Sequence, residues 1–116
     1  MSATVHVAEE NYKGIMGLSD IVSPDLFLKD GVYSLWNRGV PDPKADGKAP
    51  GKNMYGSNPF YMARANNSNW FGVFHNLAAA QDHWVQNDAA NGKVYIRTFA
   101  TSGVGSIYFF TGIGPE

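Results

Sequence analysis

Residues 93–111, KVYIRTFATSGVGSIYFFT, decide the fold class of this chain. At their start Val94, Ile96 and Thr98 share one face of an extended segment, because successive side chains of a β-strand point to opposite sides. Residues 106–111 form a second segment rich in aromatic residues, and a polar, glycine-containing connection separates the two. This period of two with short glycine-rich connections is typical of an antiparallel sandwich.

Similar extended segments occur elsewhere in the chain. They are Ala3–Ala8, Gly31–Asn37, Pro59–Ala65 and Trp70–His75. The last two flank Asn66–Asn69, a polar connection of hairpin length. We therefore predict an all-β fold, an antiparallel β-sandwich with long loops and room for one short helical turn, formed by residues 1–116 as a single domain.

Residues 76–86 are the one ambiguous stretch. Leu77–Gln81 has helical propensity, but it is too short for a stable helix. We interpret residues 76–86 as a loop followed by a short strand at His83–Gln86.

The composition excludes several classes of partner and site. Nine basic and ten acidic residues give a net charge of −1 and form no basic stripe, which argues against a nucleic-acid partner. Cysteine is absent, so there are no disulfides or thiolate metal sites, and an intracellular setting or support by a larger protein is favoured. No apolar run approaches the ~20 residues that span a membrane, so no membrane partner is expected.

The three histidines, His6, His75 and His83, do not have the spacing of metal ligands. His75 and His83 are able to meet across a sheet, but a third ligand is missing. We interpret them as single, partly buried side chains with local hydrogen bonds, and we predict neither a metal nor a cofactor.

Four motifs in order resemble the N-terminal β-sandwich domain of glycoside hydrolase family 31, which includes the α-glucosidases and the α-glucan lyases. They are YSLWN at Tyr33–Asn37, MYGSNPFY at Met54–Tyr61, GVF at Gly72–Phe74 and FFTGIGPE at Phe109–Glu116. The resemblance implies that this sandwich precedes a (β/α)₈ barrel, which carries the catalytic nucleophile and acid and is missing from this chain.

The acidic residues give no sign of a catalytic pair of their own. A glycosidase needs two carboxyl groups about 5 to 9 Å apart, one of them with a raised pKa. Nearly all acids of this chain neighbour glycine, proline, asparagine or lysine in predicted turns, where solvated carboxylates are ordinary. We predict no catalytic residue, and we expect the chain alone to be inactive.

The resemblance also implies a sugar site. In the family the strand and loop that correspond to residues 33–53 reach over the barrel and shape the subsite for the leaving or acceptor sugar. Trp36, Asn37 and Arg38 then provide a flat apolar face, an amide and a guanidinium. The family commonly has an acid after the arginine; here that position is Gly39, and Asp42 is the candidate to replace it. Alternatively, Trp36 packs in the core and Arg38 is a solvated strand end.

The remaining aromatic side chains are expected to lie mostly in the core, because strand aromatics dominate sandwich interiors. They are Tyr55, Phe60, Tyr61, Trp70, Phe71, Phe74, Trp84, Tyr95, Phe99, Tyr108, Phe109 and Phe110.

The leading hypothesis is a non-catalytic module, or a fragment, of an α-glucosidase-like enzyme that supports the barrel and contributes a loop to the sugar site. The alternatives are a stand-alone carbohydrate-binding module and a structural or protein-interaction β-domain. The expected partners are an α-glucan or maltose-like sugar, bound weakly, and either the catalytic barrel or a second copy of the chain, because a separated module exposes an apolar patch.

Overall fold

The computed structural model describes residues 2–8, 14–18, 26–36, 56–64 and 69–113. These residues are almost entirely β-structure, which confirms the predicted fold class. The strands are β1 (Ser2–Ala8), β2 (Ile15–Gly17), β3 (Gly31–Leu35), β4 (Phe60–Arg64), β5 (Trp70–Asn76), β6 (Gln81–Asp88), β7 (Lys93–Ala100) and β8 (Ser106–Gly112). A single 3₁₀ turn, η1 (Ala89–Asn91), joins β6 to β7.

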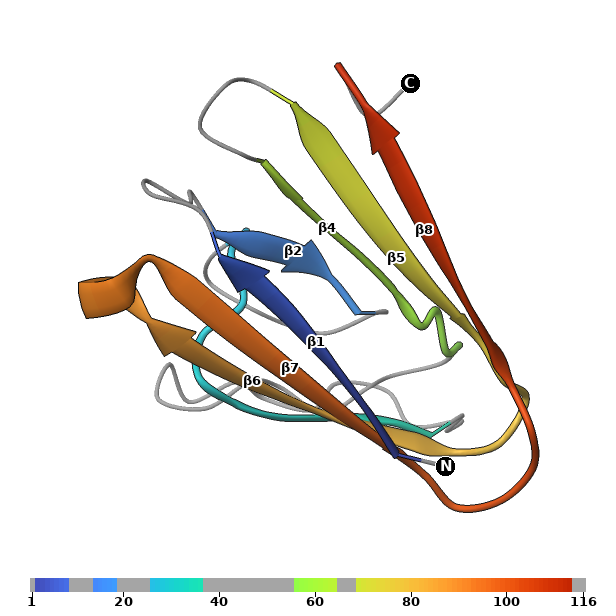
Figure 1. The fold of residues 1–116 in the computed structure, drawn as a ribbon. Coiled ribbons are helices and arrows are strands. Elements are labelled where there is room, and N and C mark those ends of the chain that lie inside the picture. Colours follow the sequence, from blue (N-terminus) through green and yellow to red (C-terminus); the bar gives the residue numbers. More distant parts are fainter. Residues whose placement is uncertain (1, 9–13, 19–25, 37–55, 65–68, 114–116) are drawn as a thin grey trace.

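The strands form two four-stranded antiparallel sheets that face each other (Figure 1). Sheet A has the order β1-β7-β6-β3, and sheet B has the order β2-β4-β5-β8. In Figure 1 the sheets approach each other near the β7–β8 connection and diverge away from it. The arrangement is an antiparallel β-sandwich, in which two amphipathic sheets bury their inner faces against each other.

The core lies between the sheets and receives side chains from both of them. Its buried apolar members are Ile15, Leu18, Tyr33, Leu35, Tyr61, Ala63, Val73, Val85, Val94 and Ile96. Along β7 the side chains of Val94, Ile96 and Thr98 are buried, as the period of two predicted. The intervening side chains of this strand point to the outer face of sheet A.

The two predicted hairpin-length connections have different outcomes. β4 and β5 pair directly, with Tyr61 opposite Val73, so residues 65–69 join neighbouring strands of one sheet. The connection between β7 and β8 is not a hairpin, because β7 belongs to sheet A whereas β8 pairs with β5 in sheet B. This crossing lets Ile107 of β8 pack against the core from the second sheet.

Two glycines allow the chain to turn from sheet A into sheet B. Gly103 has a φ of +87°, a conformation that glycine adopts without strain. At Gly105 an added Cβ atom would lie 2.9 Å from Leu77 Cβ and 3.0 Å from the Asn76 carbonyl oxygen. The corner therefore requires close approach of the backbone to the last residue of β5 and the residue that follows it.

The structure differs from the sequence analysis at β6 and β2. The ambiguous stretch contains a loop and a strand as predicted, but β6 begins at Gln81 and ends at Asp88, so it is longer than His83–Gln86. The three-residue strand β2 was not predicted, because it is too short to show a period in the sequence. Within the described ranges, no helix is long and apolar enough to cross a bilayer.

Candidate functional site

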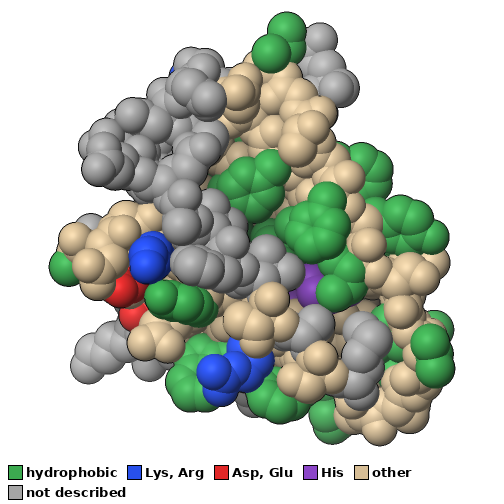
Figure 2. Space-filling view, in the orientation of Figure 1, with side chains coloured by type: hydrophobic (Ala, Val, Ile, Leu, Met, Phe, Trp, Pro, Cys, Tyr) green, Lys and Arg blue, Asp and Glu red, His purple; other side chains and the backbone are tan. Residues whose placement is uncertain are grey.

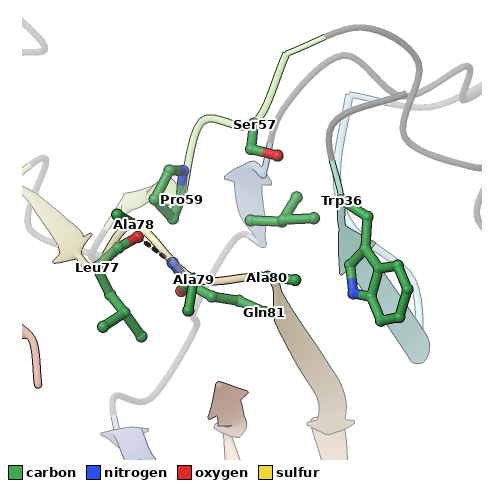
Figure 3. Close-up of a pocket in the computed structure, with 9 residues that line it drawn as sticks. Trp36, Ser57, Pro59, Leu77, Ala78, Ala79, Ala80 and Gln81 are labelled. Carbon is green, nitrogen blue, oxygen red and sulfur yellow. Dashed lines mark hydrogen bonds between the residues drawn. The ribbon is translucent and has the colours of Figure 1, made fainter. Parts of the chain in front are cut away.

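Trp36 directly follows β3 and lies at an open pocket of about 480 Å³ (Figure 3). Its side chain is 45% exposed, so it is not a core residue. Strand β3 supplies one wall of the pocket, and the segments that precede β4 and β6 supply the others. The lining residues are Leu35, Trp36, Ser57, Pro59, Leu77, Ala78, Ala79, Ala80 and Gln81.

Gln81 shapes the inner end of this pocket. As the first residue of β6 it points to the inner face of sheet A and is 3% exposed. Its Nε2 donates a hydrogen bond of 2.8 Å to the carbonyl oxygen of Leu77, which holds the irregular segment 77–80 against the strand (Figure 3). Its Oε1 is buried and has no hydrogen-bond partner. A buried acceptor in this state costs free energy, so a donor that reached it would be favourable.

The pocket has the mixed chemistry that suits a sugar ring. The Trp36 indole and the methyl groups of the alanines are apolar, whereas the Ser57 hydroxyl donates and accepts hydrogen bonds. Ligand sites typically combine such apolar walls with a few polar groups. Of the four sugar contacts expected from the sequence, the structure places Trp36 alone; Asn37, Arg38 and Asp42 lie outside the described residues.

The described part of the chain contains three carboxylates, and two of them have structural hydrogen bonds. Asp30 Oδ1 accepts bonds from the backbone N and from Nδ2 of Asn87, at 2.8 and 2.7 Å. Asp88 Oδ2 accepts a bond of 2.9 Å from Asn91 Nδ2. Asp82 lies inside strand β6, whereas the sequence analysis had placed it in the loop before His83. Asp82 and Asp88 are separated by six residues of one strand, roughly 20 Å, which is too far for a glycosidase pair.

His75 and His83 form a buried pair in the core. They come from β5 and β6, which belong to different sheets, so the two rings meet between the sheets and not across one sheet. Their ring centroids are 5.0 Å apart in an edge-to-face arrangement, and both side chains are fully buried rather than partly buried. His83 Nδ1 lies 2.9 Å from Thr98 Oγ1, and His75 Nε2 lies 3.4 Å from the Tyr61 hydroxyl.

The buried surroundings of this pair favour the neutral form of both imidazole rings. Burial lowers the pKa of His75, and burial together with the nearby His75 lowers the pKa of His83 to about 3. His75 Nδ1 and His83 Nε2 have no hydrogen-bond partner. Within the described ranges, no third histidine, cysteine or carboxylate joins them to form a group that could hold a metal.

The aromatic side chains are distributed differently from the prediction. Of the described members of the predicted core set, Tyr61 alone is fully buried. The strand period explains the error, because both sheets also carry aromatics on their outer faces. Figure 2 shows hydrophobic side chains that reach the surface in several clusters, with few charged side chains among them.

The outer face of sheet B carries a group of neighbouring aromatic side chains. Phe74 pairs with Tyr108, and the rings lie 6.2 Å apart between centroids. Phe60 covers Gly72, where an added Cβ would lie 2.9 Å from its ring, and it contacts Phe110 at 6.4 Å. Tyr108 and Phe110 are exposed along β8, which forms one edge of the sheet. We call Phe60, Phe74, Tyr108 and Phe110 the aromatic face.

Comparison with known proteins connects this fold to glucosidases. No protein-family model matches the chain. The chain is 36% identical over 109 residues to a probable alpha/beta-glucosidase of Arthroderma benhamiae, which covers 93% of the chain but 12% of that protein. It is 33% identical over 103 residues to the lysosomal alpha-glucosidase of Mus musculus, which covers 88% of the chain and 9% of that protein.

These two matches support a glycoside hydrolase-like origin for the chain. They extend over most of its length, so they concern the whole sandwich rather than a single motif. The chain spans about a tenth of the length of these curated relatives.

The sequence analysis missed Gln81 as a pocket residue and Trp84 as a surface residue. The signal was present in the alternation of residues 81–86, in which Gln81, His83 and Val85 point inward. The prediction began the strand at His83, so it left Gln81 and Asp82 out of the alternating segment. The alanines before Gln81 favour helix, which led to the later start.

Proposed function

We propose that this chain is the non-catalytic β-sandwich module, N-terminal to the barrel, of an α-glucosidase-like enzyme of glycoside hydrolase family 31. The observation that carries the proposal is the match to two glucosidases along about nine-tenths of this chain and about a tenth of theirs. A segment of that size in a much longer enzyme is well suited to a supporting role, and Asp30 and Asp88, two of the three described carboxylates, are held in hydrogen bonds with asparagine side chains.

In this proposal the strand end at Trp36 contributes to the sugar site of the assembled enzyme. Trp36 presents its indole at a pocket that Gln81 also lines. Asn37, Arg38 and Asp42 follow Trp36 in the sequence and supply the polar contacts with the sugar. The ligand is an α-glucan or a maltose-like sugar.

The aromatic face on sheet B supports docking to the catalytic barrel. A cluster of exposed aromatic rings on a sheet face marks an interaction surface. The relatives contain roughly nine times more chain than the aligned segment, so a large partner within the same polypeptide is available to cover it. Self-association of the separated chain is the competing way to bury the same rings.

The first test is the reading frame beyond the codon for Glu116. A continuous frame that encodes a barrel with its catalytic aspartates supports the proposal, and a stop codon directly after Glu116 favours a stand-alone carbohydrate-binding module or an interaction domain.

The second test is functional and uses a chimera. This chain replaces the aligned segment of the Arthroderma benhamiae relative, and hydrolysis of maltose is measured with and without Trp36→Ala. We expect an active chimera in which Trp36→Ala raises KM for maltose, because a contact with the sugar is lost. An active chimera that is unaffected by Trp36→Ala contradicts the sugar-site role but not the supporting role.

A further inference from the structure

The outer face of sheet A carries a second set of exposed side chains that is distinct from the Trp36 pocket. The register places Val32, Trp84, Arg97 and Thr4 side by side across all four strands, from β3 through β6 and β7 to β1. Trp84 and Arg97 point outward, because their neighbours along β6 and β7 are buried in the core, and Val32 and Thr4 are exposed at the paired positions of β3 and β1.

Trp84 and Arg97 form the centre of this row. The Arg97 guanidinium carbon lies 5.5 Å from the centre of the Trp84 ring, within the range of a cation–π contact. The indole nevertheless remains 46% exposed. The contact favours one orientation of a flat ring on the surface, and a ring that is already ordered loses less entropy when a ligand binds.

Hydrogen-bonding groups surround the ring. Trp84, Arg97, Thr4, Gln86 and Tyr95 line a shallow pocket of about 240 Å³. Arg97 contributes donors, and Gln86 and Thr4 contribute both donors and acceptors, at positions that the rigid sheet fixes. Beside this pocket the exposed Phe99 extends the apolar area along β7.

We propose that this face, the Trp84 platform, is a binding site for a glycan of glucose-type pyranose rings. A pyranose ring with equatorial hydroxyls has an apolar face that stacks on indole and an edge of hydroxyls that requires donors and acceptors. The platform offers both within one shallow pocket. The aromatic face on sheet B differs, because Phe60, Phe74 and Phe110 have no polar atoms and Tyr108 has only its hydroxyl. That face suits a protein surface.

Other ligand classes fit the platform less well. Nucleic acid requires several cations to neutralise phosphates, and Arg97 is the one cation that lines this pocket, in a chain of net charge −1. A single guanidinium that is already stacked on indole is likewise a poor phosphate site. The site is independent of the role proposed for Trp36, because it lies on the outer face of β6 and β7.

The test is an NMR titration of the full chain with maltohexaose and, separately, with cellohexaose, up to about 10 mM. The three tryptophans give separate indole N–H signals that identify the site. We expect at least one of the two glycans to shift the Trp84 indole signal and the amide signals of β6 and β7. Trp84→Ala should weaken this binding roughly tenfold, and Arg97→Met should weaken it several-fold.

Phe27→Ala provides the matched control. Phe27 is an exposed aromatic that precedes β3 and lies beside Gly14, outside the platform and the Trp36 pocket, so its removal should leave the Kd unchanged. Thermal unfolding of each variant verifies that it is folded.

Three outcomes would overturn the Trp84 platform. The first is the absence of any shift on β6 and β7 with both glycans. The second is a set of shifts on these strands that persists in a folded Trp84→Ala variant. The third is a set of shifts confined to Trp36 and its pocket, which would leave the proposed function intact while removing the second site.

Discussion

Acid should destabilise this protein through its buried histidine pair. The folded state holds His83 as neutral imidazole with a pKa of about 3, whereas an unfolded chain restores a value near 6.5. Because the unfolded state then binds more protons, stability is fully present above about pH 6.5 and is lost as the pH falls toward 3. His75 acts in the same direction, because burial lowers its pKa as well.

The magnitude follows from this shift. Linkage over the interval from pH 7 to pH 5 gives a loss of about 2 kcal/mol in the free energy of unfolding from His83 alone, and about 3 kcal/mol at pH 4. A domain of this size is typically stable by about 5–15 kcal/mol, so the loss is readily measured. The effect is electrostatic in origin, because the low-dielectric core excludes the charge and Thr98 and Tyr61 offer no carboxylate to compensate for it.

Urea denaturation at pH 7, 6, 5 and 4, followed by circular dichroism, measures the predicted slope. His83→Gln replaces the imidazole with an amide that does not titrate, so its stability should depend much less on pH in this interval. His6→Gln retains both buried histidines and should keep the steep slope. Equal slopes for the wild type and a folded His83→Gln variant would refute the reasoning.

Three further predictions concern activity, the sheet-crossing corner and the aromatic face. The isolated chain should show no turnover of 4-nitrophenyl α-glucoside, since the proposed function assigns the catalytic nucleophile and acid to the barrel; robust turnover would remove the non-catalytic interpretation. Gly105→Ala should lower the free energy of unfolding by roughly 1–3 kcal/mol, because its Cβ would meet Leu77 and the Asn76 carbonyl. The control Val104→Ala, at a side chain that is 97% exposed, should change the free energy of unfolding by less than about 0.5 kcal/mol in the same urea assay. The chain should self-associate in sedimentation velocity at high concentration, and Phe110→Ser should reduce this without loss of fold; a strictly monomeric wild type would argue against the aromatic face as a docking surface.

Several elements of the fold were accessible from the sequence because they depend on local order. The alternation in residues 93–100 identified strand β7 and correctly assigned Val94, Ile96 and Thr98 to the core. The polar residues between β4 and β5 correctly indicated a hairpin. In each case the signal lies within about ten consecutive residues.

The candidate sites were much less accessible. Trp36 was recognised as a candidate, but the sequence left open whether it packs in the core, and the structure shows it exposed at a pocket. Trp84 was assigned to the core with the other aromatics, and the structure places it outside. An alternating pattern indicates which residues share a face of a strand. It does not indicate which of two apolar faces will be buried.

The sequence by itself determined that this chain forms short antiparallel strands and lacks disulfides, because composition and local period are properties of the chain alone. Tertiary structure decided that β8 crosses into sheet B, that His75 and His83 meet in the core, and that Trp84 and Arg97 form a platform on sheet A. These features join residues from different strands, and their formation depends on the pairing register and on how two sheets divide the available apolar surface. The free energy gained by burying one sheet face against another depends on the whole fold and cannot be inferred from any single segment.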